Sequence, residues 1–536
     1  MQLNEQGLKN RQEGEAAGYR LPQYDREAMT ARTKENPYWV HFGAGNIFRA
    51  FQANVVQNLL NEGVIDRGII AVSGHEAMEK LNIPRDNYFI LVTLKANGST
   101  EKTVIGSVAE SLTLDGGYEK EFNRLKEIFT KDSLQMASFT ITEKGYAIRS
   151  GDGSWRSDVL EDLQKGWQAP VSYIGKICAL LYARYQAGEK PIALVSMDNC
   201  SHNGTILREA VETYVRAWCE NDLAEEGFLS YITNPEKVSF PWTMIDKICP
   251  RPDASVEAML REDHIQGTEP IITAKKTYIA PYVNAEESEY LVIEDAFPNG
   301  RPALEKGGLI FTDAETVDKV ERMKVCTCLN PLHTALSVFG CLLGYRKIHE
   351  EMQDEGIRTL VETIGYKEGL PVVTDPGIIR PEDFLDTVLK VRIPNPFMPD
   401  TPQRIVTDTS QKLAVRFGET IRAYQESNTL DVKTLKGIPL VLAGWLRYLM
   451  AVDDNGNSFE LSPEPMLDTL KPCIDGLKLT EQQDVGSIIA PVLKMKEIFG
   501  VDLYEAGLAD KVCGYLQSMT AGTGAVRRTL DKAIRE

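Results

Sequence analysis

A lysine, an asparagine and a histidine stand within one ten-residue stretch just past the middle of the chain, as Lys324, Asn330 and His333. A lysine can act as a general base where burial disfavours its ammonium form. An asparagine amide can donate to a developing oxyanion, and a histidine can orient a hydroxyl or relay a proton. Taken alone, these residues are more simply explained as a solvated lysine and a core histidine, because most charged residues lie outside active sites.

Composition sets the class of protein that must position these residues. The chain has 536 residues, enough for roughly two to four domains, and 43% of them are hydrophobic. The net charge of −18 argues against a nucleic-acid partner or an anionic membrane surface. The apolar run 440–452 is interrupted by Arg447 and is too short to span a bilayer, and the N-terminus has no hydrophobic signal core. We expect a cytoplasmic protein with a small-molecule partner, and its oligomeric state stays open.

Cysteine and histidine spacing indicates no metal site. The nine cysteines and six histidines are scattered, and the Cys326-x-Cys328 pair has no second pair nearby. We therefore predict neither a metal nor a disulfide framework, as suits a reducing compartment.

A nucleotide-binding pattern follows the first strand-like run, 38–42. A glycine turn comes next, and apolar residues then recur every four positions, as on one face of a helix. Strand, glycine turn and helix together place backbone N–H groups against a pyrophosphate. The third glycine of the usual fingerprint is replaced, so the motif alone is a weak signal. The predicted cofactor-binding residues are Phe42, Gly43, Ala44, Gly45, Asn46, Phe48 and Arg49.

The second strand of such a domain usually selects the ribose. Here the run 68–73 ends in Gly74-His75-Glu76, with no acid in the first position. Glu76 either binds a ribose or starts a solvated helix. We expect NAD, and NADP stays open.

Further strand-like and helical runs predict an α/β fold. The strand-like runs are 88–92, 137–142 and 192–196, and a helical pattern covers 172–186. Alternation of this kind favours a mostly parallel, Rossmann-like sheet that binds ligands at the carboxyl ends of its strands. Helical periodicity dominates from about residue 313, except over 366–400, where Pro and Gly predict a long loop or insertion. We predict an N-terminal extension with one helix (1–35), a dinucleotide-binding Rossmann-like domain (36–312) and a mainly α-helical substrate domain (313–536).

Polar residues near strand ends and in the helical half are further candidates. Asn199 lies in a polar loop after a strand, where a helix-capping role is the alternative. Asp246 precedes Lys247, with which it could form a plain ion pair. Arg404 and Lys412 are eight residues apart, and a helix turning ~800° over that span would allow both to reach one cleft.

Several of these segments together resemble the long-chain polyol-specific dehydrogenases, or mannitol dehydrogenase family. This family includes mannitol 2-dehydrogenase, fructuronate reductase (mannonate oxidoreductase) and tagaturonate reductase. The resemblance runs from about Trp39 to the C-terminus. It is carried by 41–45, 140–146, 196–199 with Asn203-Gly204, 292–295, and Lys324, Asn330, His333, Arg404 and Lys412.

The resemblance implies a role for each candidate residue. Lys324 would be the general base, and Asn199 and Asn330 would form the oxyanion site. His333 would position a substrate hydroxyl, and Glu321 would be the carboxylate near the base, as a proton relay. The implied substrate-binding residues are Asp246, Arg404 and Lys412, and no metal is implied.

The sequence departs from the family pattern around the lysine. Lys324 and Asn330 are six positions apart where the family has five, and Pro331-Leu332 replaces the usual Gly-Ser. One extra helical residue would rotate Lys324 by ~100°. The alternative is that Asn330 is a cap, Pro331 the first helical residue and 326–329 irregular, so that an irregular or bulged segment absorbs the extra residue. Glu321 keeps its family spacing from Lys324. The family's valine-aspartate-arginine signature also differs, since here it reads Ile245-Asp246-Lys247.

The expected function is NAD-dependent, metal-independent oxidoreduction between an open-chain sugar acid or polyol and its ketose, with D-fructuronate and D-mannonate as the leading pair. Arg404 and Lys412 could pair with a carboxylate or bind hydroxyls of a neutral polyol. Mannitol 2-dehydrogenase and tagaturonate reductase chemistry are alternatives. Alternatives from other classes are a uronate epimerase that retains its NAD, and a non-catalytic sugar- or dinucleotide-binding protein.

Overall fold

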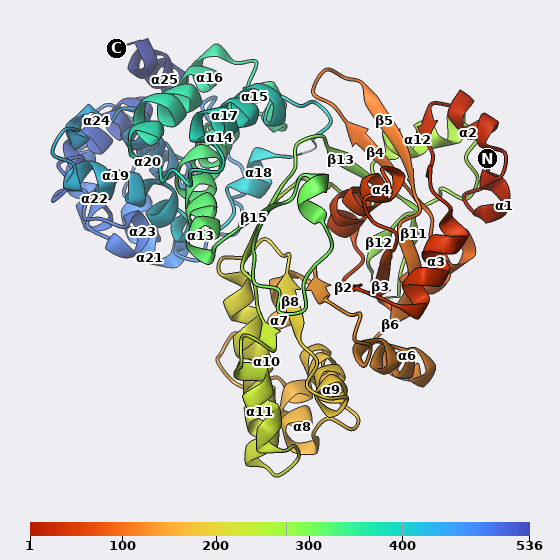
Figure 1. The fold of residues 1–536 in the computed structure, drawn as a ribbon. Helices are drawn as coiled ribbons and strands as arrows, with labels where there is room; N and C mark the ends of the chain where they lie inside the picture. The colour runs from red at the N-terminus through yellow and green to blue at the C-terminus, as the bar shows by residue number, and fades with distance from the viewer. Residues whose placement is uncertain (275, 399, 536) are drawn as a thin grey trace. The chain divides into compact units, whose positions relative to one another are not determined.

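The computed structural model describes residues 1–274, 276–398 and 400–535. Its contacts divide the chain into two compact units (Figure 1). The strand-rich unit comprises Met1–Lys95 and Ser99–Asp318. The helical unit comprises Ala96–Gly98 and Lys319–Glu536. Each unit is described below by itself.

A six-stranded parallel sheet forms the centre of the strand-rich unit, in the order β6-β3-β2-β7-β8-β9. The strands are β2 (Trp39–Phe42), β3 (Ile69–Ser73), β6 (Val108–Thr113), β7 (Met136–Phe139), β8 (Ile192–Ser196) and β9 (Val238–Ser239). Taken in chain order, this is the doubly wound arrangement of a Rossmann fold, and the strand order reverses between β2 and β7. The predicted mostly parallel, Rossmann-like sheet is confirmed.

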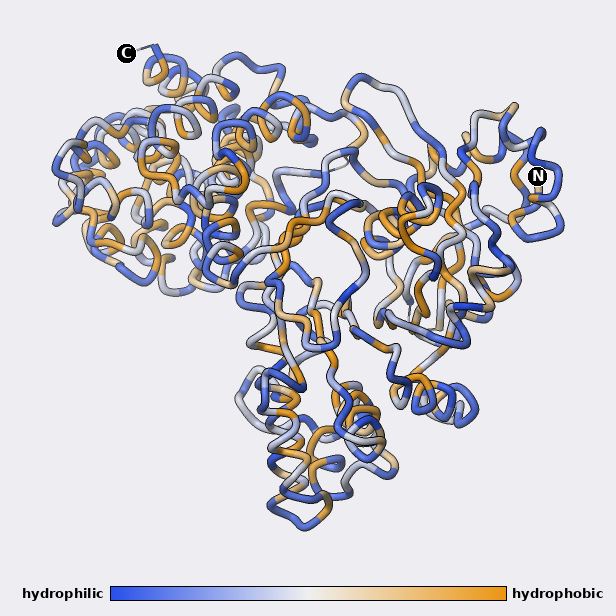
Figure 2. The backbone as a smooth tube through the Cα atoms, in the orientation of Figure 1, coloured by the Kyte–Doolittle hydropathy of each residue, from blue (hydrophilic) through white to orange (hydrophobic). Residues whose placement is uncertain are grey.

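Both faces of this sheet are covered, which explains why its inner strands are buried and mostly apolar (Figure 2). Val40 and Phe42 point to one core cluster, and Trp39 belongs to the other. Helices α6 (Glu119–Phe129), α9 (Tyr173–Gln186) and α10 (Asn203–Glu220) cover the first face. Helix α4 (Ala53–Asn61) covers the second. The smaller helices of this unit are α5 (His75–Ala77), α7 (Thr142–Tyr146), α8 (Ser157–Lys165), α11 (Glu226–Thr233) and α12 (Ala254–Glu262).

The strand-like run 88–92 does not join the parallel sheet. It lies in β4 (Phe89–Leu94), which pairs antiparallel with β5 (Thr100–Ile105) and parallel with β13 (Tyr282–Glu286). A hairpin connection of this kind carries no crossover helix, so the expected strand–helix alternation is interrupted here. The other strands are β1 (Tyr19–Arg20), β10 (Thr243–Asp246), β11 (Ile271–Ile272), β12 (Tyr278–Ile279), β14 (Tyr290–Glu294) and β15 (Ile310–Thr312).

The N-terminal segment is more ordered than one helix. It forms α1 (Glu5–Leu8), α2 (Arg11–Ala16), β1 and α3 (Arg26–Glu35), and β1 pairs with β5. Met29 is buried in the core of the strand-rich unit, and Arg26 donates to the carbonyls of Gly106 and Val108. The polar composition of this segment gave no sign of these few contacts with the core.

Two apolar helices form the core of the helical unit, α14 (Asn330–Leu343) and α20 (Gly437–Tyr448). They pack against each other, and α24 (Ala509–Met519) and α25 (Ala525–Arg535) pack around α20. Of the described residues, the helical stretch Ala314–Leu343 is long and apolar enough to cross a bilayer, and 78% of its most apolar window is buried inside the protein. The other helices are α13 (Ala314–Arg322), α15 (Ile348–Glu351), α16 (Glu355–Glu362), α17 (Pro381–Thr387), α18 (Pro402–Ile405), α19 (Glu419–Glu426), α21 (Leu467–Ile474), α22 (Val485–Leu493) and α23 (Lys496–Phe499).

The prediction of a long loop over 366–400 is wrong. The π-helical turn η6 (Thr363–Gly369) opens this stretch, and α17 and η8 (Val388–Arg392) form a continuous helical segment in its second half. Within the described residues of this stretch, backbone without helix covers 373–380 and 393–398. Pro381 stands in the first turn of α17, where a proline starts a helix rather than breaking it.

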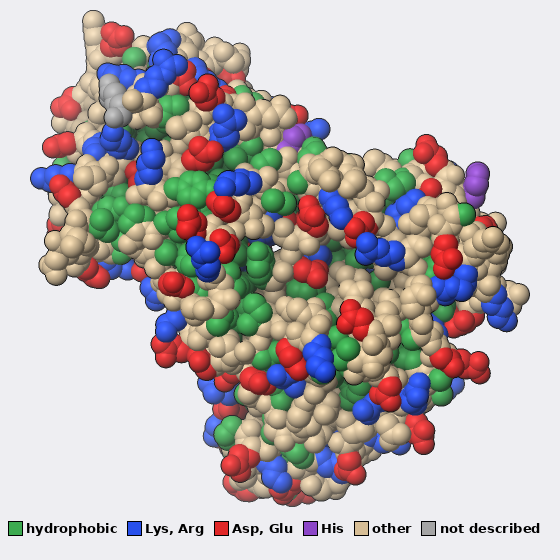
Figure 3. Space-filling model, turned by 45° about the horizontal axis from the view of Figure 1, so that its top comes forward, with side chains coloured by type: hydrophobic (Ala, Val, Ile, Leu, Met, Phe, Trp, Pro, Cys, Tyr) green, Lys and Arg blue, Asp and Glu red, His purple; other side chains and the backbone are tan. Residues whose placement is uncertain are grey.

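Acidic and basic side chains are intermixed on the face shown in Figure 3. That face therefore presents no patch of a single sign of the kind that binds nucleic acid.

Candidate functional site

A cavity of about 310 Å³ lies in the strand-rich unit, at the carboxyl ends of the parallel strands. Its lining comes from the ends of β2, β3 and β7 and from the segments that follow β6 and β7, and includes Gly43, Gly74, Asp115, Ile141 and Tyr173. This is the point where the strand order reverses, and doubly wound sheets bind their ligands there.

The glycine turn after β2 has the backbone that a pyrophosphate requires. Gly43 has φ +95°, and a Cβ on it would lie 2.1 Å from the carbonyl oxygen of Thr140. The Gly43 N–H donates to the Val72 carbonyl at 2.8 Å. A Cβ on Gly45, by contrast, would meet no atom closer than 3.8 Å, so the backbone is open to a ligand at that position. A helix begins just beyond this turn and continues through η1 (Phe48–Gln52) into α4.

The aromatic residues predicted around this turn face the core. Phe42 stacks on Phe139 with ring centroids 5.2 Å apart. Phe48 stacks on His41 at 4.1 Å, and burial lowers the pKa of His41 to about 3. Ala44 packs against the same core. These positions therefore shape the turn through packing and backbone, and their side chains are not in the cavity lining.

Asn46 and Arg49 form a polar pair on the first turn of that helix. The Arg49 guanidinium donates to Asn46 Oδ1 at 2.9 Å and to the Ala280 carbonyl at 2.6 Å. Arg49 Nε is buried and has no hydrogen-bond partner in the part of the chain that the structure describes. Burial lowers the pKa of Arg49 to about 10. A buried cation with a spare donor beside a glycine turn fits an anionic group such as a pyrophosphate.

Asp115 is one of two acidic residues that line the cavity, with Asp158, and the sequence analysis missed it. Its carboxylate accepts the His75 N–H at 2.8 Å from the segment after β6. Glu76, the residue considered for the ribose, instead pairs with Lys80 at 2.5 Å and accepts the Ala274 N–H at 2.8 Å. The signal for Asp115 was an acid at a strand end before Gly116-Gly117, two residues typical of a turn.

Asp198 fixes the loops that follow β7 and β8. Its carboxylate accepts the N–H groups of Ile141 and Thr142, at 2.8 and 3.0 Å, and the Tyr146 hydroxyl at 2.7 Å. Burial raises the pKa of Asp198. Asn203 is also buried and bonds to Thr243 at the start of β10. The predicted Asn199 lies between these two anchors, exposed at the strand end.

Asp246 ends β10 and is 6% exposed. Its neighbour Lys247 extends to Glu289 at 2.7 Å and to the Glu286 carbonyl at 2.9 Å. The ion pair considered for Lys247 is thus made with Glu289, as expected where neighbouring strand residues point to opposite faces.

Lys324 lies in the helical unit, on a π-helical turn, η5 (Met323–Cys328), and is 4% exposed. The Leu329 N–H donates to the Lys324 carbonyl at 3.1 Å, closing a turn of the i→i+5 type. Such a turn holds one residue more than an α-helical turn, so it takes up the extra position between Lys324 and Asn330. Of the two alternatives that the sequence left open, the structure has the bulged segment. Helix α14 begins at Asn330 itself, with Leu329 rather than Asn330 as its cap and Pro331 in its first turn.

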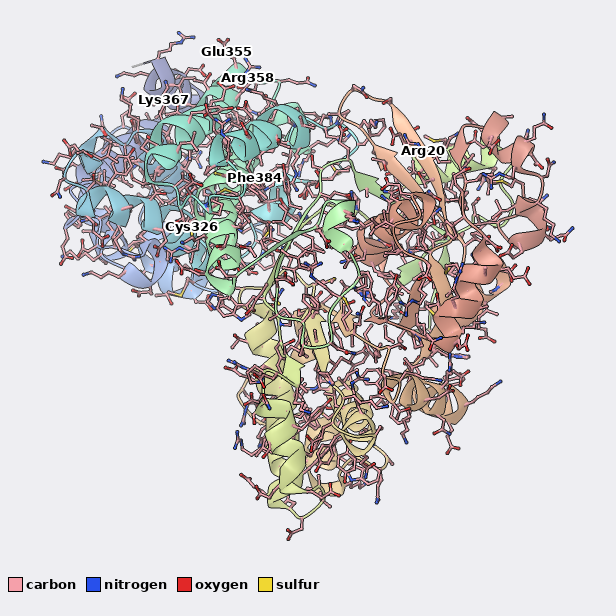
Figure 4. The ribbon with its side chains drawn as sticks, in the orientation of Figure 1. Arg20, Cys326, Glu355, Arg358, Lys367 and Phe384 are labelled. Carbon is pink, nitrogen blue, oxygen red and sulfur yellow. The ribbon has the colours of Figure 1, made fainter. Side chains whose placement is uncertain are left out.

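The other predicted residues of this segment lie on the same helical run. Glu321 is in the last turn of α13, and Asn330 and His333 are in the first turns of α14, all half-buried. Thr334 donates to the Asn330 carbonyl at 3.1 Å. Cys326, labelled in Figure 4, is on η5, which contacts α17, the helix that carries the labelled Phe384.

Arg404 and Lys412 do not share one helix, so the helical-spacing argument for them is wrong. α18 ends at Ile405, Asp408 has φ +53°, and a 3-10 turn, η9 (Thr409–Gln411), precedes Lys412. Arg404 pairs with Asp400 through Nε at 2.6 Å, and its side chain is 71% exposed. Lys412 is half-buried and donates to the carbonyls of Ile405 and Thr407.

Among residues 1–274, 276–398 and 400–535, no group of three or more His, Cys, Asp or Glu side chains is placed to hold a metal ion. All nine cysteines are free thiols.

Comparison with known proteins covers nearly the whole chain. Residues 38–306 match the mannitol dehydrogenase Rossmann domain, and residues 316–520 match the mannitol dehydrogenase C-terminal domain. The D-mannonate oxidoreductase of Thermotoga maritima is 48% identical over 538 aligned positions, which cover 100% of this chain and 99% of the relative.

Two solved structures are similar along the whole length. A substrate-free D-sorbitol dehydrogenase is 25% identical, with a TM-score of 0.79, over 97% of this chain and 98% of that one. The Pseudomonas fluorescens mannitol 2-dehydrogenase, in a ternary complex with NAD and D-mannitol, is 27% identical, with a TM-score of 0.68, over 100% of both chains. The chain therefore belongs to the mannitol dehydrogenase family of oxidoreductases.

Proposed function

We propose that this protein is an NAD-dependent oxidoreductase that interconverts D-mannonate and D-fructuronate. The observation that carries the proposal is the 48% identity, over the full length of both chains, to a D-mannonate oxidoreductase. The solved relative that holds NAD supports the choice of cofactor.

The residues at the carboxyl edge of the parallel sheet fit NAD. The open backbone at Gly45 and the buried Arg49 would hold the pyrophosphate, and the Asp115 carboxylate would accept the ribose hydroxyls. A carboxylate at that place would repel the 2′-phosphate of NADP, which favours NAD. When bound, NAD supplies the hydride acceptor for the carbinol carbon.

Lys324 would move the proton of the reacting hydroxyl. An alcohol is a poor acid, so loss of hydride from its carbon requires removal of the hydroxyl proton at the same time. The amine of Lys324 would accept that proton in the oxidation, and its ammonium would return it in the reduction. Burial of Lys324 at 4% exposure keeps competing water from this atom.

The remaining predicted residues would bind and orient the substrate. Asn330 would donate its amide N–H to the carbinol oxygen as negative charge grows on it. Asn199 would supply a second amide donor, and His333 would position a neighbouring hydroxyl. The other proposed roles are substrate contact by Asp246, Arg404 and Lys412, and proton relay by Glu321.

Mannitol and fructose form the second candidate substrate pair, because a mannitol 2-dehydrogenase is among the similar solved structures. The epimerase alternative was motivated by the altered spacing between Lys324 and His333. The π turn η5 gives that spacing a structural explanation, so the motive for an epimerase is weaker.

The test is NADH oxidation by the purified protein with D-fructuronate, D-tagaturonate and D-fructose in parallel, and with NADPH as the control cofactor. We expect the highest kcat/KM with fructuronate and NADH. A highest kcat/KM with fructose would support the mannitol assignment instead. Isomerisation of a uronate without net NADH oxidation would support the epimerase.

A further inference from the structure

Arg416 is a cation of the helical unit that the sequence analysis did not single out. It lies on the π-helical turn η10 (Ala414–Gly418), which packs against η5, the turn that carries Lys324. Its guanidinium donates to Thr334 Oγ1 at 2.7 Å. Thr334 follows His333 in α14 and donates in turn to the Asn330 carbonyl. Arg416 is therefore joined by hydrogen bonds to the segment that holds the proposed amide donor.

The guanidinium of Arg416 retains most of its donors. An arginine has five N–H donors, and the bond to Thr334 is the one that Arg416 makes within residues 1–274, 276–398 and 400–535. No carboxylate of those residues forms an ion pair with it. Glu419, the closest acid along the chain, is engaged with Arg422 at 2.5 Å. Burial alone lowers the pKa of Arg416 to about 10.

A second cation lies beside it. Lys412 is half-buried. Burial lowers its pKa most and the positive charge of Arg416 lowers it further, while the carboxylates of Asp408 and Glu464 act in the opposite direction. Its ammonium is held by two backbone carbonyls, which carry no net charge to offset its own. Two neighbouring cations repel each other, and an anion bound to both would remove that repulsion.

Arg404 has a different environment. Asp400 already engages both Nε and a terminal nitrogen of Arg404, and the side chain is 71% exposed. A carboxylate ligand would have to displace Asp400 from Arg404, whereas it would meet free N–H groups on Arg416. The planar guanidinium fork matches a carboxylate through two parallel bonds.

We infer that Arg416, with Lys412 beside it, binds the carboxylate of the sugar acid and so selects a uronate over a neutral ketose. The inference rests on the proposed function, because it names the residue that recognises the acid group of that substrate. Thr334 acts as a positioning residue that fixes the plane of the Arg416 guanidinium.

The test compares Arg416→Gln, Arg416→Lys and Thr334→Val with the wild-type enzyme on fructuronate and NADH. Arg416→Gln should raise KM by about 10- to 100-fold, the usual loss for a hydrogen-bonded charge, and change kcat less than KM. Arg416→Lys keeps the charge without the fork and should recover part of the loss. Thr334→Val should raise KM by a smaller factor. The NADH dissociation constant should stay at the wild-type value in all three.

Arg358→Gln is the matched control, since Arg358 is also a half-buried arginine of the helical unit that donates to a backbone carbonyl (Figure 4). A fall in kcat with unchanged KM in Arg416→Gln would overturn the inference. A larger rise in KM from Arg404→Gln than from Arg416→Gln would overturn it too. If Arg416→Gln does not fold, Arg416→Lys and Thr334→Val test the inference instead. Both should raise KM for fructuronate, and an unchanged KM in both would overturn the inference.

Failure of the proposed function is recognised separately, in the wild-type enzyme. A wild type that does not reduce fructuronate refutes the proposed function and this inference together. A wild type that reduces fructuronate, with variants that show no selective rise in KM, refutes this inference alone.

Discussion

The Tyr146 hydroxyl donates to the Asp198 carboxylate at 2.7 Å, and this bond joins the loop after β7 to the loop after β8. The same carboxylate also accepts the N–H of Ile141, a residue that lines the cavity at the edge of the parallel sheet. A single half-buried acid thus holds the part of the cavity wall that follows β7, close to the point where the strand order reverses. Tyr146 itself is 2% exposed and also bonds to Ser196 at 2.8 Å.

Replacing Tyr146 with Phe should weaken both the fold and the cavity. The change leaves the half-buried Asp198 with one donor fewer, which should lower the free energy of unfolding by about 1–2 kcal/mol. Because the loop then loses one of its three hydrogen bonds to Asp198, the NADH dissociation constant should rise as well. Urea unfolding and NADH fluorescence titration measure the two effects. Tyr504→Phe is the control, since Tyr504 is 42% exposed, and equal results for both variants would refute the role given to Tyr146.

Gly43→Ala should disrupt the turn after β2. The new Cβ would lie 2.1 Å from the Thr140 carbonyl oxygen, in a residue with φ +95°. We expect a loss of about 2–4 kcal/mol in unfolding free energy and weaker NADH binding. Gly63→Ala separates the cost of a positive φ from the cost of the steric clash, because Gly63 also has positive φ but no atom within 4 Å of the added Cβ. Gly63→Ala should lower the unfolding free energy by about 1–2 kcal/mol and leave NADH affinity unchanged. Wild-type NADH affinity in Gly43→Ala would place the cofactor elsewhere.

Lys324→Ala tests the proton-transfer role. Removal of a positioned general base should lower kcat by about 100- to 10,000-fold while NADH still binds, because Lys324 belongs to the helical unit and the predicted cofactor-binding residues belong to the strand-rich unit. Steady-state kinetics and NADH titration check the two halves of this expectation. Lys390→Ala, at an exposed lysine of the same unit that pairs with Asp386 at 2.7 Å, serves as the control. Lys324→Ala with a wild-type kcat would remove Lys324 from the mechanism.

Glu351 predicts a pH dependence of stability that is separate from catalysis. Burial raises its pKa to about 10, and Asp354, Asp400 and Glu350 add to the shift. Neither of its carboxylate oxygens has a hydrogen-bond partner among the described residues. Above pH 4.5, the ordinary pKa of this group, the unfolded chain binds fewer protons than the folded one. The stability that Glu351 contributes is therefore full below that pH and falls as the pH rises toward about 10.

Glu351→Gln should remove this fall, because the amide cannot ionise and fills nearly the same volume. Thermal unfolding at a series of pH values would show the variant gaining on the wild type as the pH rises from 5 to 9, roughly the window between the two pKa values. Glu426→Gln, at an exposed glutamate that ends α19, should run parallel to the wild type over that range. A constant difference between Glu351→Gln and the wild type would contradict the raised pKa.

Local pattern was enough to predict the elements of the parallel sheet. The run 192–196 is strand β8 with the predicted bounds, and the helical pattern of 172–186 is α9 with Ser172 as its cap. These segments are long, apolar and marked by clear caps, so their structure depends little on distant residues. The prediction of a loop over 366–400 was wrong because it took prolines as helix breakers, whereas Pro381 stands in the first turn of α17.

In the candidate site, too, local features could be predicted from the sequence and long-range contacts could not. The glycine turn and the order of polar residues from Lys324 to His333 are local features, and the sequence by itself determined them and the family they resemble. Asp115, Tyr146 and Arg416 were missed because each acts through a partner distant along the chain: His75, Asp198 and Thr334. Only the tertiary structure decided these contacts, because hydrogen bonds between distant residues leave no periodic trace in a sequence. It also decided between a regular helix and a π turn after Lys324.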